Sequence, residues 1–253
     1  MKYIRFQTKN DNKYGILKDA LIYELNDTFF QTSEMSGSVY DIKSVKLLPP
    51  VIPTKIIALG YNYKDLVGDR NEYDEPVIFL KPTSSLIGHG DTIEIFSSMN
   101  KVWVEIELCI IIGKTAKNVN EENAHEYIFG FTIGNDVTTS NILNRDHHLA
   151  RAKGWDTFCP IGPWIETELE TNNLKLKNSI NGTVYQESNT NMRIYNDGKI
   201  VSHLSKIMTL YPGDIIMSGT PSNAENSVVK NADVVTLEIE KLGKLSNQIL
   251  LIK

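Results

Sequence analysis

The chain has 253 residues, of which 41% are hydrophobic and 23% are charged, and its formal net charge is −5 at pH 7. This length and composition are typical of a globular protein with a sizeable core, arranged as one large domain or two small ones. The negative charge excludes a bulk attraction to nucleic acid or anionic membranes, and no apolar run approaches the ~20 residues that span a bilayer.

The first 50 residues read as a small unit of short strands. Segments 2–8 and 13–25 alternate polar and apolar residues, which is typical of strands joined by turns. The N-terminal segment lacks the apolar middle of a signal peptide, so a cytoplasmic protein with free cysteines is expected. Three prolines at 49–53 mark a boundary. We therefore expect a small N-terminal domain over 1–50 and a larger domain over 51–253.

The remaining chain is richer in strand signals than in helix signals. A helix is expected to begin within 122–131 and another within 203–214, and Asn181-Gly182 predicts a tight hairpin. Further strands are expected at 55–60, 77–82, 92–96, 132–138, 214–217 and 234–253. No regular alternation of strands and helices is present, so the expected fold is mostly β, of the α+β class, with short helices.

The run KVWVEIELCIIIG at 101–113 contains two carboxylates in an otherwise apolar strand. Side chains of a strand alternate between faces, so Glu105 and Glu107 point the same way, about 7 Å apart. Two such carboxylates beside apolar neighbours repel each other unless a cation is present, and hard divalent cations prefer oxygen ligands. A solvent-facing strand edge explains the spacing equally well.

A third carboxylate favours the cation. Asp136 ends the apolar segment TIGNDVT, where a strand can deliver it to the same place. Three carboxylates form a plausible Mg²⁺ or Mn²⁺ site. Lys153, in AKGWDTF, is either a surface cation or a charge positioned for an anionic ligand. The SGTPS segment at 218–222 is either a plain turn or a cradle for a carboxylate.

These segments occur in an order that resembles the fumarylacetoacetate hydrolase family. The matching motifs lie within residues 51–253 and read GYNYKD, VIFLKP, VEIELCIIIGK, GFTIGNDVT, AKGWDTFCPIGPW, YQESNT and GDIIMSGTP. The resemblance implies mixed strands rolled into a sandwich-like barrel, a small leading domain, and a homodimer. It also implies a small-molecule 2-oxo acid or 2-hydroxy-dienoic acid as substrate.

The resemblance further implies the roles of individual residues. It implies an Mg²⁺ or Mn²⁺ ion held by Glu105, Glu107 and Asp136, and it makes Lys153 the catalytic lysine. The implied substrate-binding residues are Tyr63, Gln186, Gly219 and Thr220.

The sequence also departs from the family pattern. Members that hydrolyse acylpyruvates carry a His and a Glu in N-Y-x-x-H-x-x-E, a dyad that activates water. Here Leu66 stands at the histidine, and Asp69 at the glutamate is the remaining catalytic candidate. Ser140 stands where many relatives have an arginine that clamps a carboxylate. Residues 223–225 read N-A-E where relatives often have G-V-G.

We therefore expect a divalent-metal-dependent enzyme that acts on a 2-oxo or 2-hydroxy-dienoic (di)carboxylate through a metal-bound enolate. Hydrolytic cleavage, decarboxylation and isomerisation remain open, and Leu66 favours the last two because leucine cannot accept a proton. The alternative is a catalytically degenerate member that binds metal and a small carboxylate without turnover. A third reading makes the glutamates structural. The sequence separates neither the substrates nor Mg²⁺ from Mn²⁺.

Overall fold

The computed structural model describes residues 1–9, 11–68, 74–140, 146 and 148–253. Strands dominate, as expected for a mostly β fold. Their bounds are β1 (Lys2–Gln7), β2 (Asn12–Lys18), β3 (Leu21–Leu25), β4 (Met35–Asp41), β5 (Lys46–Leu47), β6 (Ile56–Gly60), β7 (Val77–Lys81), β8 (Leu86–Ile87), β9 (Thr92–Phe96), β10 (Val102–Trp103), β11 (Ile106–Ile112), β12 (Ile128–Asn135), β13 (Thr138–Thr139), β14 (Cys159–Glu166), β15 (Lys175–Ile180), β16 (Thr183–Asn189), β17 (Ile215–Met217), β18 (Val234–Ile239) and β19 (Gly243–Ile252).

The helices are short, as the sequence predicts. The α-helices are α1 (Lys64–Val67), α2 (Ala150–Lys153) and α3 (Asp197–Ile207), and the 3₁₀ turns are η1 (Ile42–Ser44), η2 (Thr83–Ser85), η3 (Glu121–Tyr127), η5 (Thr190–Met192) and η6 (Ala224–Asn226). Helix α3 begins before the expected segment because Asn196 caps it, accepting a hydrogen bond from the Lys199 N–H. The helix expected to begin within 122–131 is confirmed as the 3₁₀ helix η3, which ends at Tyr127, where the chain continues directly into the largely buried strand β12.

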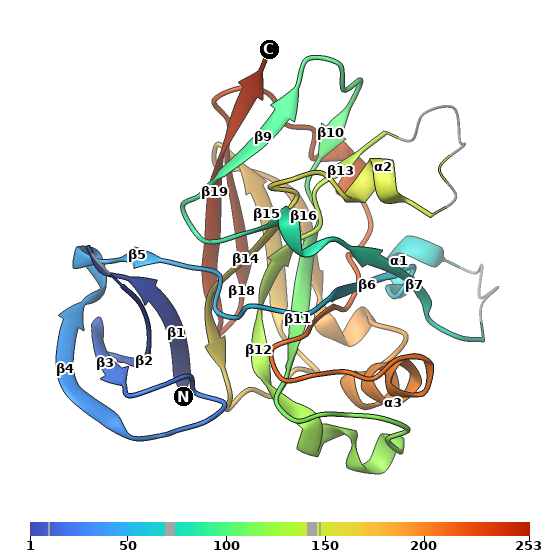
Figure 1. The fold of residues 1–253 in the computed structure, drawn as a ribbon. Coiled ribbons are helices and arrows are strands. Elements are labelled where there is room, and N and C mark those ends of the chain that lie inside the picture. The colour runs from blue at the N-terminus through green and yellow to red at the C-terminus, as the bar shows by residue number, and fades with distance from the viewer. Residues whose placement is uncertain (10, 69–73, 141–145, 147) are drawn as a thin grey trace.

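The strands form two main sheets. The larger sheet follows the order β4-β3-β2-β1-β14-β12-β11-β17-β6-β7, and the smaller one follows β16-β15-β18-β19-β9. The larger sheet curls back on itself. The evidence is β8, which follows the edge strand β7 in the chain and pairs in parallel with β14, a strand inside the same sheet. Figure 1 shows β11, β12 and β14 running side by side through the centre of the molecule. The expected rolled sandwich is therefore confirmed.

Strand β11 is the centre of the core and explains why the 101–113 run is so apolar. All of its residues are buried. Ile106, Leu108 and Ile110 pack in the main core with α3 and the smaller sheet, whereas Cys109 and Ile111 pack in a second core on the opposite face. A strand that is buried on both faces reads as a continuous hydrophobic run. Both cysteines are buried free thiols.

The N-terminal strands β1–β4 curl beside the central strands in Figure 1 and have a core of their own around Ile4, Phe6 and Ile22. They are nevertheless hydrogen-bonded to the rest of the molecule, because β1 pairs with β14. The domain boundary after residue 50 stays a prediction.

The hairpin at Asn181-Gly182 is confirmed. Both residues have positive φ, 51° and 84°, and they join β15 to β16 directly. These angles are those of a type I′ turn, which suits the twist of paired strands.

Candidate metal centre and pocket

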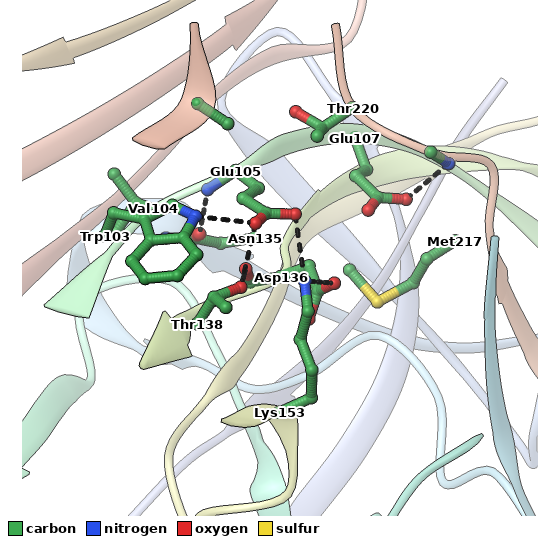
Figure 2. Close-up of polar contacts among 12 residues, drawn as sticks. Trp103, Val104, Glu105, Glu107, Asn135, Asp136, Thr138, Lys153, Met217 and Thr220 are labelled. Atoms are coloured by element: carbon green, nitrogen blue, oxygen red, sulfur yellow. Dashed lines mark hydrogen bonds and ion pairs between the residues drawn. The ribbon is translucent and has the colours of Figure 1, made fainter. Parts of the chain in front are cut away.

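Three carboxylates meet where β11 begins and β12 ends. The two strands are antiparallel and pair Ile106 with Asn135, so Glu105 and Asp136 leave them at the same end. The Asp136 N–H donates to the Glu105 carbonyl at 3.0 Å, which fixes the two backbones together. Oxygens of Glu105, Glu107 and Asp136 all lie within 4.8 Å of one another. The structure thus brings together the three residues that the sequence singled out (Figure 2).

The expected continuous strand over 101–113 is interrupted at Val104 and Glu105. At these two residues the backbone N–H groups do not form strand-to-strand hydrogen bonds with β12. The Val104 N–H donates to the carbonyl of Ser227, and the Glu105 N–H donates to the side chain of Asn135. The Glu105 carboxylate accepts hydrogen bonds from Trp103 Nε1 at 2.8 Å and Thr138 Oγ1 at 2.9 Å. Glu105 is therefore anchored by its own local contacts.

All three carboxylates are buried, which excludes the solvent-exposed strand edge. Glu105 is 8% exposed, and Glu107 and Asp136 are 1% exposed. Burial, followed by the charges of Asp136 and Glu105, raises the pKa of Glu107 well above its ordinary value. In the described chain the Glu107 carboxylate accepts one hydrogen bond, from the Gly219 N–H at 2.6 Å.

Lys153 lies at the end of α2 and points into the carboxylate cluster. Its ammonium group donates to Glu105 Oε2 at 3.0 Å and to Asp136 Oδ2 at 2.5 Å (Figure 2). Burial opposes its charge, but the two carboxylates outweigh burial and raise the pKa of Lys153. The lysine is thus a buried cation, and the surface-cation reading is wrong.

A second lysine, which sequence reasoning missed, lies behind the cluster. Lys81 ends β7 and is 2% exposed. Its ammonium group donates to Asp136 Oδ1 at 2.5 Å and to the Lys153 carbonyl at 2.6 Å. Burial opposes ionisation of Asp136, but Lys153 and Lys81 outweigh it and lower the pKa of Asp136. The available signal was the pattern VIFLKP, a lysine that closes an apolar strand before a proline.

A pocket of about 380 Å³ opens onto the cluster. Glu105, Asp136 and Lys153 form its charged wall, and Tyr61 and Leu66 come from the segment after β6. The remaining described lining consists of Leu59, Gly60, Phe79, Trp103, Thr138, Thr139, Leu149, Ala152, Thr220, Asn223, Ala224 and Glu225. Apart from its charged wall, this pocket is mostly apolar.

The predicted substrate-binding residues divide into two groups. Thr220 lines the pocket, and Gly219 is next to it with a φ of +97°, a conformation that suits glycine. Gln186 lies behind this loop: its Nε2 donates to Thr220 Oγ1 and to the Pro221 and Ser222 carbonyls. Gln186 thus shapes the pocket by holding this loop, and its contact with substrate stays a prediction.

Tyr63 does not line the pocket. It is fully buried in the main core, and its hydroxyl finds no hydrogen-bond partner among the described residues. The pocket residue of this segment is Tyr61, two positions earlier, with a φ of 58°. Asn62 holds the segment in place by donating to the Ser218 carbonyl at 2.7 Å. Asp69 lies outside the described residues.

The donor set fits a divalent cation. Three buried carboxylates are met by only two ammonium groups in the described chain, so the cluster has one surplus negative charge once all three carboxylates are ionised. Oxygen-rich sites of this kind suit Mg²⁺ and Mn²⁺. Glu105, Glu107 and Asp136 are the residues that could hold such an ion.

Comparison with known proteins agrees with this geometry. The model of the fumarylacetoacetate (FAA) hydrolase C-terminal family matches residues 55–250, and an Rv2993c-like N-terminal model matches residues 1–50. The chain is 33% identical to an oxaloacetate tautomerase, fahd2, of Xenopus laevis, covering 89% of this chain and 76% of the relative.

Solved structures show the same likeness. A 5-carboxymethyl-2-hydroxymuconate delta-isomerase from Mycobacterium smegmatis superposes with a TM-score of 0.93 at 34% identity, covering 100% of both chains. A maleylpyruvate hydrolase from Sphingobium sp. SYK-6, in complex with manganese(II) and pyruvate, superposes with a TM-score of 0.83 at 25% identity, again covering 100% of both chains. Within the described residues no helix is long and apolar enough to cross a membrane. The chain belongs to the fumarylacetoacetate hydrolase family.

Proposed function

We propose that this family member is a divalent-metal-dependent enzyme that isomerises or decarboxylates a 2-oxo acid or 2-hydroxy-dienoic acid. Its ion would be Mg²⁺ or Mn²⁺, held by Glu105, Glu107 and Asp136. The observation that carries the proposal is one pocket in which the acidic cluster and Lys153 face a leucine, Leu66.

The charged wall is suited to negative charge that develops on a substrate oxygen. When bound, the divalent ion supplies a Lewis acid that polarises the 2-oxo group of the substrate. Lys153 adds a fixed positive charge at the same wall and is buried, where electrostatic stabilisation is stronger than in water. Loss of a proton from C3, and loss of CO₂ from a carboxylate carried on C3, both leave the electron pair on C3 as the enolate of the 2-oxo group, so one arrangement serves both reactions.

Leu66 disfavours hydrolysis. Hydrolytic relatives place a histidine at this position, and losing a positioned general base typically costs about 10²–10⁴-fold in rate. In this chain Leu66 lines the pocket with Leu59 and Phe79, so the wall that would present a water-activating base is apolar. Isomerisation and decarboxylation need no activated water.

The relatives support a reaction of this class. The tautomerase and the isomerase are named for moving protons or double bonds in oxo or hydroxy-dienoic acids. The maleylpyruvate hydrolase complex holds manganese(II) and pyruvate, a metal and a 2-oxo acid of the kinds proposed here. A homodimer and a cytoplasmic location stay predictions.

Product analysis tests the proposal. The protein is assayed with an acylpyruvate, oxaloacetate and a 2-hydroxy-dienedioate, each with Mg²⁺, Mn²⁺ or EDTA. We expect metal-dependent isomerisation or decarboxylation of at least one compound and slow acylpyruvate hydrolysis. The matched variant is Leu66→His, which should raise the hydrolysis rate.

Two outcomes would overturn the proposal. Rapid acylpyruvate hydrolysis as the sole activity would assign the chain to the hydrolytic branch. Failure with the whole panel, while oxalate still binds in the presence of Mn²⁺, would identify a binding protein without turnover.

A further inference from the structure

Lys81 connects two parts of the candidate site and is separate from the pocket lining. In the strand order, β7 lies four strands from β12, which would be about 19 Å in a flat sheet. Because the sheet curls, the ammonium group of Lys81 nevertheless reaches Asp136, the residue that follows β12. The contact therefore exists only in the closed form of the roll.

The two acceptors of Lys81 belong to the two functional elements of the site. One is Oδ1 of Asp136, a candidate metal ligand, and the other is the main-chain carbonyl of Lys153. Helix α2, which ends at Lys153, is a single turn of four residues and is too short to be stable alone. One buried side chain thus sets both the carboxylate and the backbone from which Lys153 projects.

The two oxygens of the Asp136 carboxylate accept hydrogen bonds from different lysines. Oδ1 bonds to Lys81, whereas Oδ2 bonds to Lys153, which lies on the pocket wall. Oδ2 is therefore the oxygen directed at the pocket side of the cluster. Hydrogen bonds of this kind to the far side of a ligand orient metal-binding groups in proteins, and their loss typically costs 10–100-fold in metal affinity or activity.

We propose that Lys81 is a positioning residue for the divalent ion: it fixes Asp136 through Oδ1 and so directs Oδ2, which also accepts from Lys153, at the pocket side of the cluster, while it anchors the backbone of Lys153. This inference rests on the proposed function, because it presupposes an ion at the three carboxylates. It adds a residue that lies outside the pocket lining.

The test measures Mn²⁺ binding directly, by calorimetry and by the electron paramagnetic resonance signal of free Mn²⁺. The variants are Lys81→Met, an unbranched side chain that lacks only the terminal ammonium group and so has no charge or donor, and Lys81→Gln, which keeps a donor without charge. The matched control is Lys55→Met. Lys55 and the buried Asp214 directly precede the paired strands β6 and β17, away from the carboxylate cluster, and they form an ion pair.

We expect Lys81→Met to bind Mn²⁺ about 10–100-fold more weakly than the unmodified protein. Lys81→Gln should fall between the two, and Lys55→Met should bind Mn²⁺ normally despite a lower melting temperature. In turnover assays the Mn²⁺ concentration for half-activation should rise with the dissociation constant. The KM for the 2-oxo acid at saturating Mn²⁺ should stay unchanged, since Lys81 does not line the pocket.

The possible failures are distinguishable. If the unmodified protein binds no Mn²⁺, the proposed function fails and the role of Lys81 fails with it. If the unmodified protein and folded Lys81→Met bind Mn²⁺ equally, only the role of Lys81 is overturned. If neither Lys81 variant folds while Lys55→Met does, Lys81 is a structural residue and the positioning role is overturned as well.

Discussion

Two buried aspartates that pair with lysines, Asp214 and Asp136, lie at strand ends of the larger sheet, and their carboxylates are satisfied in different ways. At the first pair, Asp214 is fully buried and accepts hydrogen bonds from the main-chain N–H groups of Thr54, Lys55 and Tyr211. The Thr54 hydroxyl and the Lys55 ammonium group also donate to it. Folding alone supplies this carboxylate with all its partners.

At the second pair, Asp136 belongs to a cluster that folding leaves unbalanced. Its side-chain partners in the described structure are the ammonium groups of Lys81 and Lys153, and the adjacent Glu107 receives a single N–H. A buried carboxylate that is met by main-chain donors holds the structure together. A buried group of carboxylates that outnumbers the ammonium groups paired with it can bind an additional cation.

The largest expected effect is on folding, from Asp214→Ala. Removing this carboxylate leaves three main-chain N–H groups and Lys55 without their acceptor, so the free energy of unfolding should fall by about 3–5 kcal/mol. Urea denaturation measures the loss. The Mn²⁺ dissociation constant of the folded variant should be unchanged, and weaker binding would remove the distinction between the two pairs.

Glu107→Gln should have the opposite effects: weaker Mn²⁺ binding without a loss of folding stability. The variant should bind Mn²⁺ at least 100-fold more weakly, since a ligand should matter more than the outer contacts that cost 10–100-fold. Its free energy of unfolding should stay the same or rise, because one of three adjacent buried carboxylates is removed. Calorimetry and urea denaturation give the two values. Normal Mn²⁺ binding would show that the cluster is structural.

Added Mn²⁺ should stabilise the protein through the cluster. At a free concentration of 100 times the dissociation constant, binding to the folded state contributes about 2.7 kcal/mol. For a chain of this size the melting temperature should rise by roughly 5–10 °C. EDTA should reverse the shift, Asp214→Ala should show the same shift from a lower starting point, and Glu107→Gln should show none.

The smallest effect is a pH dependence. Burial, then Asp136 and Glu105, raises the pKa of Glu107 above its unfolded value, so between the two values the folded state holds a proton that the unfolded state has lost. The stability of the ion-free protein therefore falls as pH rises through this window. Mn²⁺ displaces the proton, so its affinity should rise by up to about tenfold per pH unit below the raised pKa.

Mn²⁺ titrations between pH 5 and 8 measure this dependence. The control is Glu107→Gln, which has no proton to lose at this position, so any residual binding should be nearly independent of pH. A flat profile in the unmodified protein would contradict the raised pKa of Glu107.

The acidic cluster was largely predictable because its signals are local. Glu105 and Glu107 lie two residues apart in an apolar segment, and Asp136 follows a second one, so their sequence positions suggested a shared site. Their burial, which excludes a solvent-facing edge, came only from the structure. The hairpin at Asn181-Gly182 was predictable for the same reason, since two adjacent residues determine the turn.

Other features depended on contacts between distant segments. The break at Val104 and Glu105 arises because Ser227 and Asn135 take over their backbone N–H groups. Gln186 holds the 220–222 loop from behind through its side-chain amide. Neither partnership has a local sequence signal, because each joins residues that are at least 30 positions apart.

By itself, the sequence predicted that strands dominate, and its family resemblance placed three carboxylates and one lysine in a single site. That Leu66 replaces a base stays a prediction. The tertiary structure decided that the cluster is buried, that Tyr61 and not Tyr63 lines the pocket, and that Lys81 holds Asp136 from behind. The physical reason is the closure of the sheet. Alternation along a strand fixes which way a side chain points, but only the curled roll brings β7 to the end of β12.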